Sequence, residues 1–579
     1  MACWLGLQDK AFTLPRRNTL TRLRVRFGHS PRMEDAVRTL VVTFLTLVSL
    51  FGFTRPTSAI AQQSSSIGEV HFATTCDEGV VTDFDRAVAL LHSFEFAESR
   101  QTFEAVATAD PGCAMAHWGI AMTYYHPLWA PPRPNDVEHG SAAADAALAM
   151  ASSEREAGFI EAIATFYRDY EILDHRTHAM AYEEAMELVT AGHPEDPEAA
   201  IFHQLAVLSN ADPTDETYAV QRMTGAFFEG LFADMPEHPG LAHYIIHSYD
   251  YPPLSAMAVE AAHRYLEIAP SLAHAVHMSS HIFTQEGMWE ASIDANLRSV
   301  TSAREAGEKL GTVVQAQRGE MHASDYRVYA FLQQGENKAA REIVAHIEAF
   351  EGLHWEVGVV AFNASAAPVR YAMERHAWTE AAALEEATEA EQASDAYQNQ
   401  AAAAMRHWAR AVGAARSGDI NGARAALTRV TRSALESRDH PYVWVRNTTE
   451  VFRLQAEGWL ALAEDRGDEA IQFMREAAAL EDQTDKESLS PGRVLPAHEQ
   501  LGDMLMELEQ AEEAFREYAE SLSHAARRFN SIYGMARSAQ AWGRGDLAAH
   551  SYRLLLELAV ADSPRPEVAE AREYMAMGD

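Results

Sequence analysis

Residues 256–295, AMAVEAAHRYLEIAPSLAHAVHMSSHIFTQEGMWEASIDA, contain the pattern that decides the fold. One run rich in alanine and glutamate ends at Pro270, a second run follows it, and Gly287 separates the second run from a third. Alanine, glutamate and leucine favour helix, whereas proline cannot continue a helix and glycine readily adopts the turn that ends one. The stretch therefore predicts the end of one helix followed by a helical hairpin.

The same pattern recurs along the chain with a period of 34 residues. A small residue, an alanine and a tyrosine occur twice at this spacing near the C-terminus: Gly502, Ala514 and Tyr518, then Ala536, Ala548 and Tyr552. This spacing resembles the tetratricopeptide repeat (TPR), in which each unit is a hairpin of helix A and helix B. The resemblance implies an all-α fold, a TPR-like α-solenoid of stacked helical hairpins.

The N-terminal segment, residues 1–61, has the features of an export signal. An apolar run over residues 40–53 follows several arginines and precedes Ala59-Ile60-Ala61, a small-residue pattern typical of signal cleavage. The run is too short for a standard membrane-spanning helix, although a retained anchor is the alternative. We therefore expect an extracytoplasmic protein, periplasmic or secreted, with no membrane span after signal cleavage.

The rest of the chain is predicted to form two sets of repeats. Residues 62–350 read as an N-terminal TPR-like solenoid with a histidine-rich groove, and residues 376–579 as C-terminal TPR-like repeats. Residues 351–375 depart from the repeat pattern and are predicted to be an irregular connection.

Charge and cysteine content narrow the possible partners and the compartment. The chain has a formal net charge of −37, which repels nucleic acid and anionic lipid.

Cys76 and Cys113 are the two cysteines left after removal of the signal segment. An even number of cysteines in an oxidising compartment indicates a disulfide between them, and two buried free thiols are the alternative.

A histidine pair also recurs with the 34-residue period. His243 and His247 are followed 34 residues later by His277 and His281. In the TPR register these residues take positions 5 and 9 of helix A. The same register puts four more polar residues on the groove face of helix A: His274 and His322 at position 2, Asp325 at position 5 and Asp250 at position 12. In TPR proteins such positions line the concave surface, so the resemblance predicts that these side chains lie near one another.

Histidines on one surface indicate a metal site, because neutral imidazole is a common ligand of transition metals. The predicted ligands are His243, His247, His277 and His281, with His274 and His322 as secondary candidates. Asp250 and Asp325 are the candidate catalytic groups, acting as a base or as orienters of a ligand. The metal would be one zinc, copper or iron ion. The alternatives are packed core histidines, a groove for an anionic peptide and a pH sensor.

A narrower resemblance supports export. The segments DPGCAMAHWGIAM and AHAVHMSSHIF are similar to those of a family of secreted bacterial TPR proteins that carry an H-M-x-x-H-I segment. The histidines that recur in that family map onto His243, His247, His277 and His281. The resemblance implies fold and location, and it implies no activity.

Two functions follow from these patterns. The first is an exported TPR-repeat protein that binds a peptide or protein partner of the cell envelope through its concave groove. The alternative is a metal-dependent enzyme, a hydrolase or oxidoreductase, that uses the His/Asp cluster in that groove.

Overall fold

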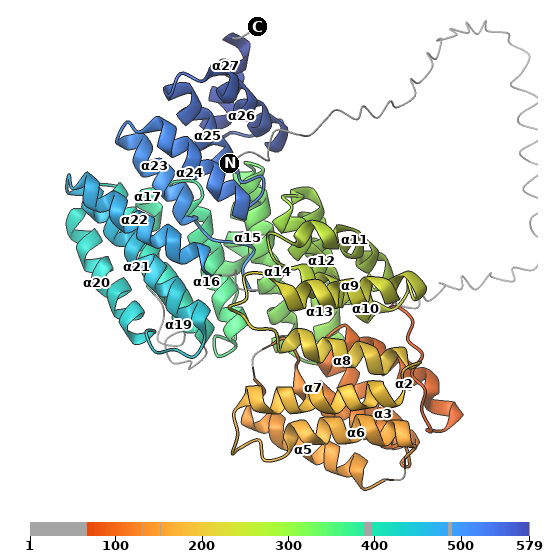
Figure 1. Ribbon diagram of the computed structural model, residues 1–579. Coiled ribbons are helices and arrows are strands. Elements are labelled where there is room, and N and C mark those ends of the chain that lie inside the picture. Colours follow the sequence, from red (N-terminus) through yellow and green to blue (C-terminus); the bar gives the residue numbers. More distant parts are fainter. Residues whose placement is uncertain (1–66, 130, 151, 387–396, 485–488, 578–579) are drawn as a thin grey trace, which may run out of the picture. The chain divides into compact units, whose positions relative to one another are not determined.

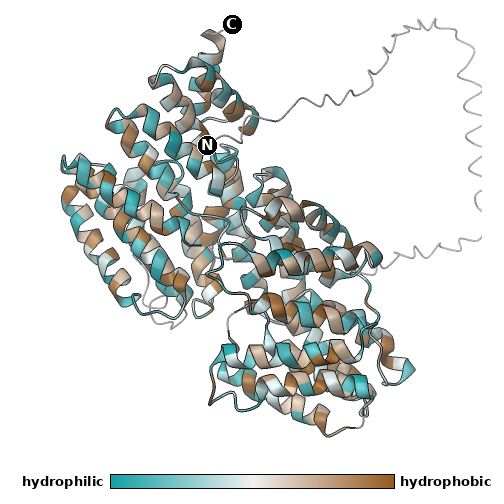
Figure 2. Ribbon diagram, in the orientation of Figure 1, coloured by the Kyte–Doolittle hydropathy of each residue, from teal (hydrophilic) through white to brown (hydrophobic). Residues whose placement is uncertain are grey.

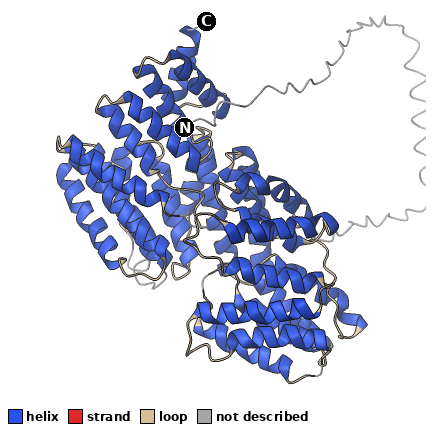
Figure 3. Ribbon diagram, viewed as in Figure 1, coloured by secondary structure: helices blue, strands red, loops and turns tan. Residues whose placement is uncertain are grey.

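The computed structural model describes residues 67–577 except 130, 151, 387–396 and 485–488 (Figure 1). The described residues form helices joined by short loops, with no strand among them (Figure 3). The predicted signal segment, residues 1–61, lies outside this part. No helix within the described ranges is long and apolar enough to span a bilayer.

The N-terminal half of the described chain begins at a short 3-10 helix and ends in two long helices. In order, the elements are η1 (Glu78–Val80), α2 (Val81–His92), α3 (Phe96–Ala109), α4 (Ala114–Tyr125), α5 (Pro134–Leu148), α6 (Glu154–Tyr167), α7 (His175–Gly192), α8 (Pro197–Ser209), α9 (Ala219–Asp234), α10 (Pro239–Tyr249), η2 (Ser255–Ala258), α11 (Val259–Ile268), α12 (Ala273–Gln285), α13 (Trp289–Leu310) and α14 (Val313–Gln333).

The C-terminal half continues in the same manner. Its helices are α15 (Asn337–Glu348), α16 (Gly358–Met373), α17 (Trp378–Ala382), α19 (Tyr397–Arg416), α20 (Ile420–Glu436), α21 (Val443–Ala463), α22 (Gly467–Asp482), α23 (Ala497–Glu507), α24 (Ala511–His524), α25 (Phe529–Ala541), α26 (Gly545–Leu558) and α27 (Pro566–Met577).

The hairpin predicted from residues 256–295 is present. Pro270 lies between α11 and α12, and Gly287 lies between α12 and α13 with φ +65°. Glycine takes this left-handed conformation without the steric cost that a Cβ brings. Because α12 starts at Ala273 and α10 at Pro239, both helices begin at the residues expected from the TPR register.

Small residues let neighbouring helices approach closely, as in TPR hairpins. A Cβ on Gly502 would lie 2.8 Å from the ring of Tyr518, and one on Gly534 would lie 2.3 Å from the same ring. Tyr518 of α24 is buried between α23 and α25, and the helices carry both hydrophobic and hydrophilic residues along their lengths (Figure 2). The prediction of an all-α fold of TPR-like hairpins is confirmed.

The repeat spacing changes at α13 and α14. These helices have 22 and 21 residues, longer than α12 with 13. The histidines at the equivalent positions, His274 and His322, are therefore 48 rather than 34 residues apart. This insertion hides the repeat from a fixed-period comparison, although α14 also ends just before a glycine, Gly335.

The predicted irregular connection over residues 351–375 is instead mostly helical, since α16 occupies Gly358–Met373. Its apolar side chains are buried, and burial stabilises this helix even though Pro368 removes one backbone hydrogen bond. The described residues within 67–577 belong to one compact unit, and among them no division into two repeat domains occurs at this point.

Candidate metal centre

Three helices that lie side by side, α10, α12 and α14, carry the predicted histidines (Figure 1). Each was predicted to be a helix A, and residues spaced by three or four lie on one helix face. The imidazoles collect into two groups of three, and within each group one nitrogen per ring lies within 4.8 Å of the others. The first triad is His243, His247 and His274, and the second is His277, His281 and His322.

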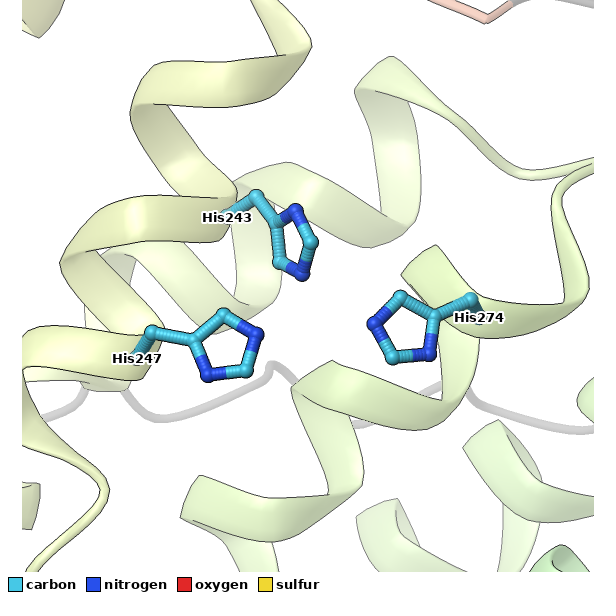
Figure 4. Close-up of side chains that lie close together, drawn as sticks. All are labelled: His243, His247 and His274. Atoms are coloured by element: carbon cyan, nitrogen blue, oxygen red, sulfur yellow. The ribbon is translucent and has the colours of Figure 1, made fainter. Parts of the chain in front are cut away.

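The first triad joins two turns of α10 to the start of α12, and its imidazoles point toward one another (Figure 4). The Nδ1 atom of His243 lies 2.7 Å from the carbonyl oxygen of His92. A carbonyl only accepts, so this Nδ1 carries the proton and Nε2 carries the lone pair. That Nε2 atom and the Nε2 of His274 are buried and have no hydrogen-bond partner among the described residues.

The first triad is enclosed by aromatic rings and one carboxyl group. Phe94 packs edge-on against His243 with ring centroids 4.5 Å apart, and Trp129 packs edge-on against His274 at 5.6 Å. Glu95 accepts a hydrogen bond of 3.1 Å from the backbone N–H of His274. Burial raises the pKa of Glu95 to about 7.

The second triad joins two turns of α12 to α14. The Nδ1 atom of His281 lies 2.8 Å from the carboxylate of Asp250, and the Nδ1 of His277 lies 2.7 Å from the amide oxygen of Asn296. His322 packs on His277 with centroids 4.2 Å apart. The Nε2 atoms of His277 and His281 face each other at 3.0 Å.

This last contact has an unusual proton arrangement. Carboxylate and amide oxygens accept hydrogen bonds, so Asp250 and Asn296 place the protons of the two rings on Nδ1. The Asn296 orientation is fixed because its Nδ2 donates to the carbonyl of Ser292 at 2.8 Å. In the neutral state both Nε2 atoms therefore present lone pairs to each other. Such a contact is repulsive unless a cation lies between the two nitrogens.

The protein disfavours protonation of three of these rings. Burial, followed by repulsion from neighbouring imidazoles, holds the pKa of His243, His274 and His277 well below the usual value. Neutral imidazole is the form that binds metals, so the environment keeps the rings ready as ligands at neutral pH.

The structure divides the predicted ligands differently from the single four-histidine set. His243 and His247 lie with His274, whereas His277 and His281 lie with His322. The two residues predicted as secondary candidates thus complete the triads. The reason is geometric: position 2 of one helix A lies beside positions 5 and 9 of its neighbour, so each group spans two adjacent helices.

The two candidate acids have different surroundings. Asp250 bonds His281 and also accepts from the side-chain amide of Gln285, which makes it an orienter of a ligand. Asp325 is fully buried and is held by Arg370 at 3.1 Å. This ion pair engages both carboxylate oxygens, so Asp325 is not available as a base for either triad.

Three residues that hydrogen-bond to triad histidines could not be predicted as site residues from the sequence. They are Asn296 on α13, His92 on α2 and Glu95 in the α2–α3 turn. None of them belongs to a motif. Asn296 is 19 residues from His277, and His92 is 151 residues from His243, so only the packing of the helices brings these pairs together.

Two other clusters contain residues that bind metals in other proteins. In the first, Glu198 bonds both His92 and His238 at 3.0 and 3.1 Å, so the carboxylate has both partners within the protein. In the second, Cys76 and Cys113 form a disulfide with a Cα–Cα distance of 4.7 Å. In both clusters the possible metal ligands bond to one another, so we assign both clusters a role in stabilising the fold.

No protein-family model and no curated protein matches the chain. Solved structures with similar helical architecture include Cut9 from the APC/C hetero-tetramer Cut9–Hcn1 (11% identity, 86% of this chain and 95% of that chain, TM-score 0.30). A monomeric mutant of IFIT1 (12%, 84% and 96%, TM-score 0.37) and yeast Tom70 (9%, 87% and 96%, TM-score 0.31) are similar in the same way. The likeness is one of fold alone.

Proposed function

We propose that the protein binds transition-metal ions at its two histidine triads, one ion at each. The observation that carries the proposal is the 3.0 Å contact between the Nε2 atoms of His277 and His281, both of which Asp250 and Asn296 leave as lone-pair donors. Two imidazole nitrogens bound to one tetrahedral zinc ion lie about 3.3 Å apart. The observed separation is close to that value.

A proton is the alternative cation, and the surroundings oppose it. His277 is buried, and burial together with the neighbouring His322 and His281 lowers its pKa well below the usual value. A proton on one of these rings would disfavour protonation of the two others, whereas a divalent ion would be bound by all three neutral rings.

The ligand type limits the metal and its chemistry. Three imidazoles suit zinc, copper or iron and leave a coordination position for water or a ligand. A metal at such a site supplies Lewis acidity or electron transfer, so a hydrolase or an oxidoreductase is the enzyme class that the site would serve. The Asp250–His281–metal arrangement is the pattern by which proteins orient a ligand and raise its basicity.

Export to an oxidising compartment is part of the proposal. The Cys76–Cys113 disulfide supports it, because disulfides persist outside the reducing cytosol. The N-terminal sequence of residues 1–61 supports it independently through its signal-like pattern.

The test is a titration of metal-free protein with zinc in competition with a chromophoric chelator. Wild type is expected to bind two equivalents tightly, and His281→Asn is expected to lose one of them. His346→Asn is the matched control, because His346 is half exposed and lies outside both triads. A folded wild type that binds no zinc, copper or iron would refute the proposal.

A second candidate function is binding of a peptide or protein partner, and a pocket in the C-terminal half favours it. Its lining includes Phe362, Met405, Trp444, Val451 and Phe452. An apolar pocket of this kind accepts a hydrophobic side chain of a partner. Partner capture that survives metal chelation and is lost in Met405→Glu would support this function. If metal chelation abolishes capture of the partner, partner binding would instead be assigned to the triads.

A further inference from the structure

The two histidine triads are neighbours, because helix α12 contributes to both. His274 belongs to the first triad, and His277 and His281 belong to the second. His274 and His277 are three residues apart, so their side chains leave one face of α12 with Cβ atoms about 5–6 Å apart. The triads also occupy equivalent positions of successive repeats, and packed helices lie about 8–10 Å apart. We therefore expect two bound ions to lie on the order of 10 Å from each other.

The ligand atoms of both triads are neutral. Among the described residues, each group contains three imidazoles and no carboxylate. Asp250 bonds the Nδ1 of His281, whereas the Nε2 of that ring faces His277. Glu95 accepts from the backbone N–H of His274 and not from its ring. A carboxylate held at this distance offsets the charge of an ion less than a carboxylate bound to the ion.

The protein shields the triads from water. The rings of His243, His277 and His281 are buried, and the other three are half-buried. Phe94 covers His243, and Tyr326 packs on His277 and His281 with centroids 4.8 and 5.0 Å apart. The free energy lost when an ion leaves water grows with the square of its charge. A divalent ion therefore loses about four times as much as a monovalent ion of the same size.

Repulsion between the ions adds to this cost when both triads are filled. The repulsion is proportional to the product of the two charges, so two divalent ions repel about four times as strongly as two monovalent ions at the same distance. Neutral imidazoles donate lone pairs but cancel none of this charge. Both effects favour a monovalent ion, and copper is the transition metal bound by imidazole that is readily monovalent.

We propose that the two filled triads hold copper(I) in preference to divalent ions such as zinc. The preference arises because each triad buries its ion without an anionic ligand and because the second ion lies close to the first. Copper changes its oxidation state whereas zinc does not, so the oxidoreductase class is favoured over the hydrolase class. This inference rests on the proposed metal-binding function and adds the identity and the charge of the metal.

Anaerobic competition between copper(I) and zinc for the metal-free full chain tests the preference. At equal free concentrations of the two ions, set by chelators, wild type is expected to hold two copper ions and no zinc. This measurement uses wild type alone and does not depend on how any variant folds. A wild type that holds more zinc than copper would overturn the inference while metal binding stands.

Titration of variants that keep one triad tests the cause. His243→Asn/His247→Asn and His277→Asn/His281→Asn each leave one triad intact, and His346→Asn/His550→Asn, outside both triads, is the matched control. The coupling is the product of the two single-triad binding constants divided by the product of the two wild-type constants. Zinc is expected to give a coupling of about tenfold or more, and a tenfold coupling with zinc corresponds to about twofold with copper(I).

The outcomes separate this inference from the proposed function. Equal coupling with zinc and copper(I), or no coupling with either, would overturn the inference while metal binding stands. If wild type binds neither ion, the proposed function fails and the inference fails with it. Weaker coupling with copper(I) than with zinc, together with two bound copper ions in the competition, would support the inference.

Discussion

At the residue scale, the central feature is the set of hydrogen bonds that orient the imidazoles. The 34-residue period predicts that the histidines at positions 5 and 9 of helix A face the groove, and the same register predicts this for the histidines at position 2. The hydrogen-bond partners of these histidines could not be predicted, because only the packing of the helices brings Asn296 and His92 next to them. The ion pair of Asp325 could not be predicted for the same reason, since its partner Arg370 lies on another helix.

Asp250→Asn is predicted to weaken metal affinity at the second triad by about 10–100-fold. The amide keeps the shape of the side chain but removes the negative charge that makes His281 a stronger ligand. Asp294→Asn, on the exposed surface of α13, is the matched control. Competition titration with zinc measures the effect, and equal affinities for the two variants would contradict the role given to Asp250.

His498 is predicted to stabilise the fold in a pH-dependent way. Burial lowers its pKa, but bonds to Asp482 at 3.2 Å and Glu517 at 2.6 Å outweigh burial and raise the pKa to about 10. Because the folded-state pKa exceeds the unfolded value of about 6.5, the stabilisation is complete below pH 6.5 and is lost as the pH rises to about 10.

Melting temperatures of wild type and His498→Asn check this prediction. The gap between them is expected to be largest below pH 6.5 and to close near pH 10. His550→Asn, at an exposed position on α26, controls for the substitution itself. A gap that is the same at pH 6 and pH 10 would show that the ion pairs of His498 do not contribute.

At the element scale, the helical hairpins and their turns could be predicted, whereas their lengths could not. Glycine and proline mark helix ends locally, which is why α10 and α12 begin at the predicted residues. The lengths of α13 and α14, and the presence of α16, depend on which of their side chains pack against other helices. Tertiary burial of this kind leaves no fixed-period signal in the sequence.

Close helix packing is predicted to make two glycines of α9 respond in opposite directions to alanine. A Cβ on Gly225 would lie 2.3 Å from the ring of Tyr249 on α10, so Gly225→Ala is expected to destabilise the protein by about 1–3 kcal/mol. Gly230 has nothing within 4 Å of its Cβ position, so Gly230→Ala is expected to stabilise by up to about 1 kcal/mol.

Urea unfolding of both variants measures these changes. Gly225 packs against α10, which carries His243 and His247, so Gly225→Ala is also expected to lower zinc affinity at the first triad. If both substitutions stabilise the protein equally, the close approach of α9 to α10 is incorrect.

At the scale of the whole molecule, buried charges connect helices that are far apart in the sequence. Arg528, at the start of α25, is fully buried and bonds Glu374 at 2.9 Å and Glu499 at 2.7 Å. Its guanidinium also lies near the hydroxyl of Tyr329 on α14, at 3.3 Å. These contacts span up to 199 residues of chain and could not be predicted from local sequence.

Arg528→Gln is predicted to destabilise the protein by about 3–5 kcal/mol, because it leaves two carboxylates buried without their cation. Arg466→Gln, at an exposed arginine of the α21–α22 turn, is expected to leave stability unchanged. Urea unfolding monitored by circular dichroism distinguishes the two. A change of less than about 1 kcal/mol for Arg528→Gln would contradict the importance of this network.

The measurement that tests the central claim most directly is elemental analysis of untagged protein isolated from an exported preparation. Wild type is expected to hold two transition-metal ions per chain. The double variants His243→Ala/His247→Ala and His277→Ala/His281→Ala are each expected to hold one. A folded wild type without bound metal, even after incubation with zinc, copper and iron, would show that the two triads are packing features and would contradict the proposed function.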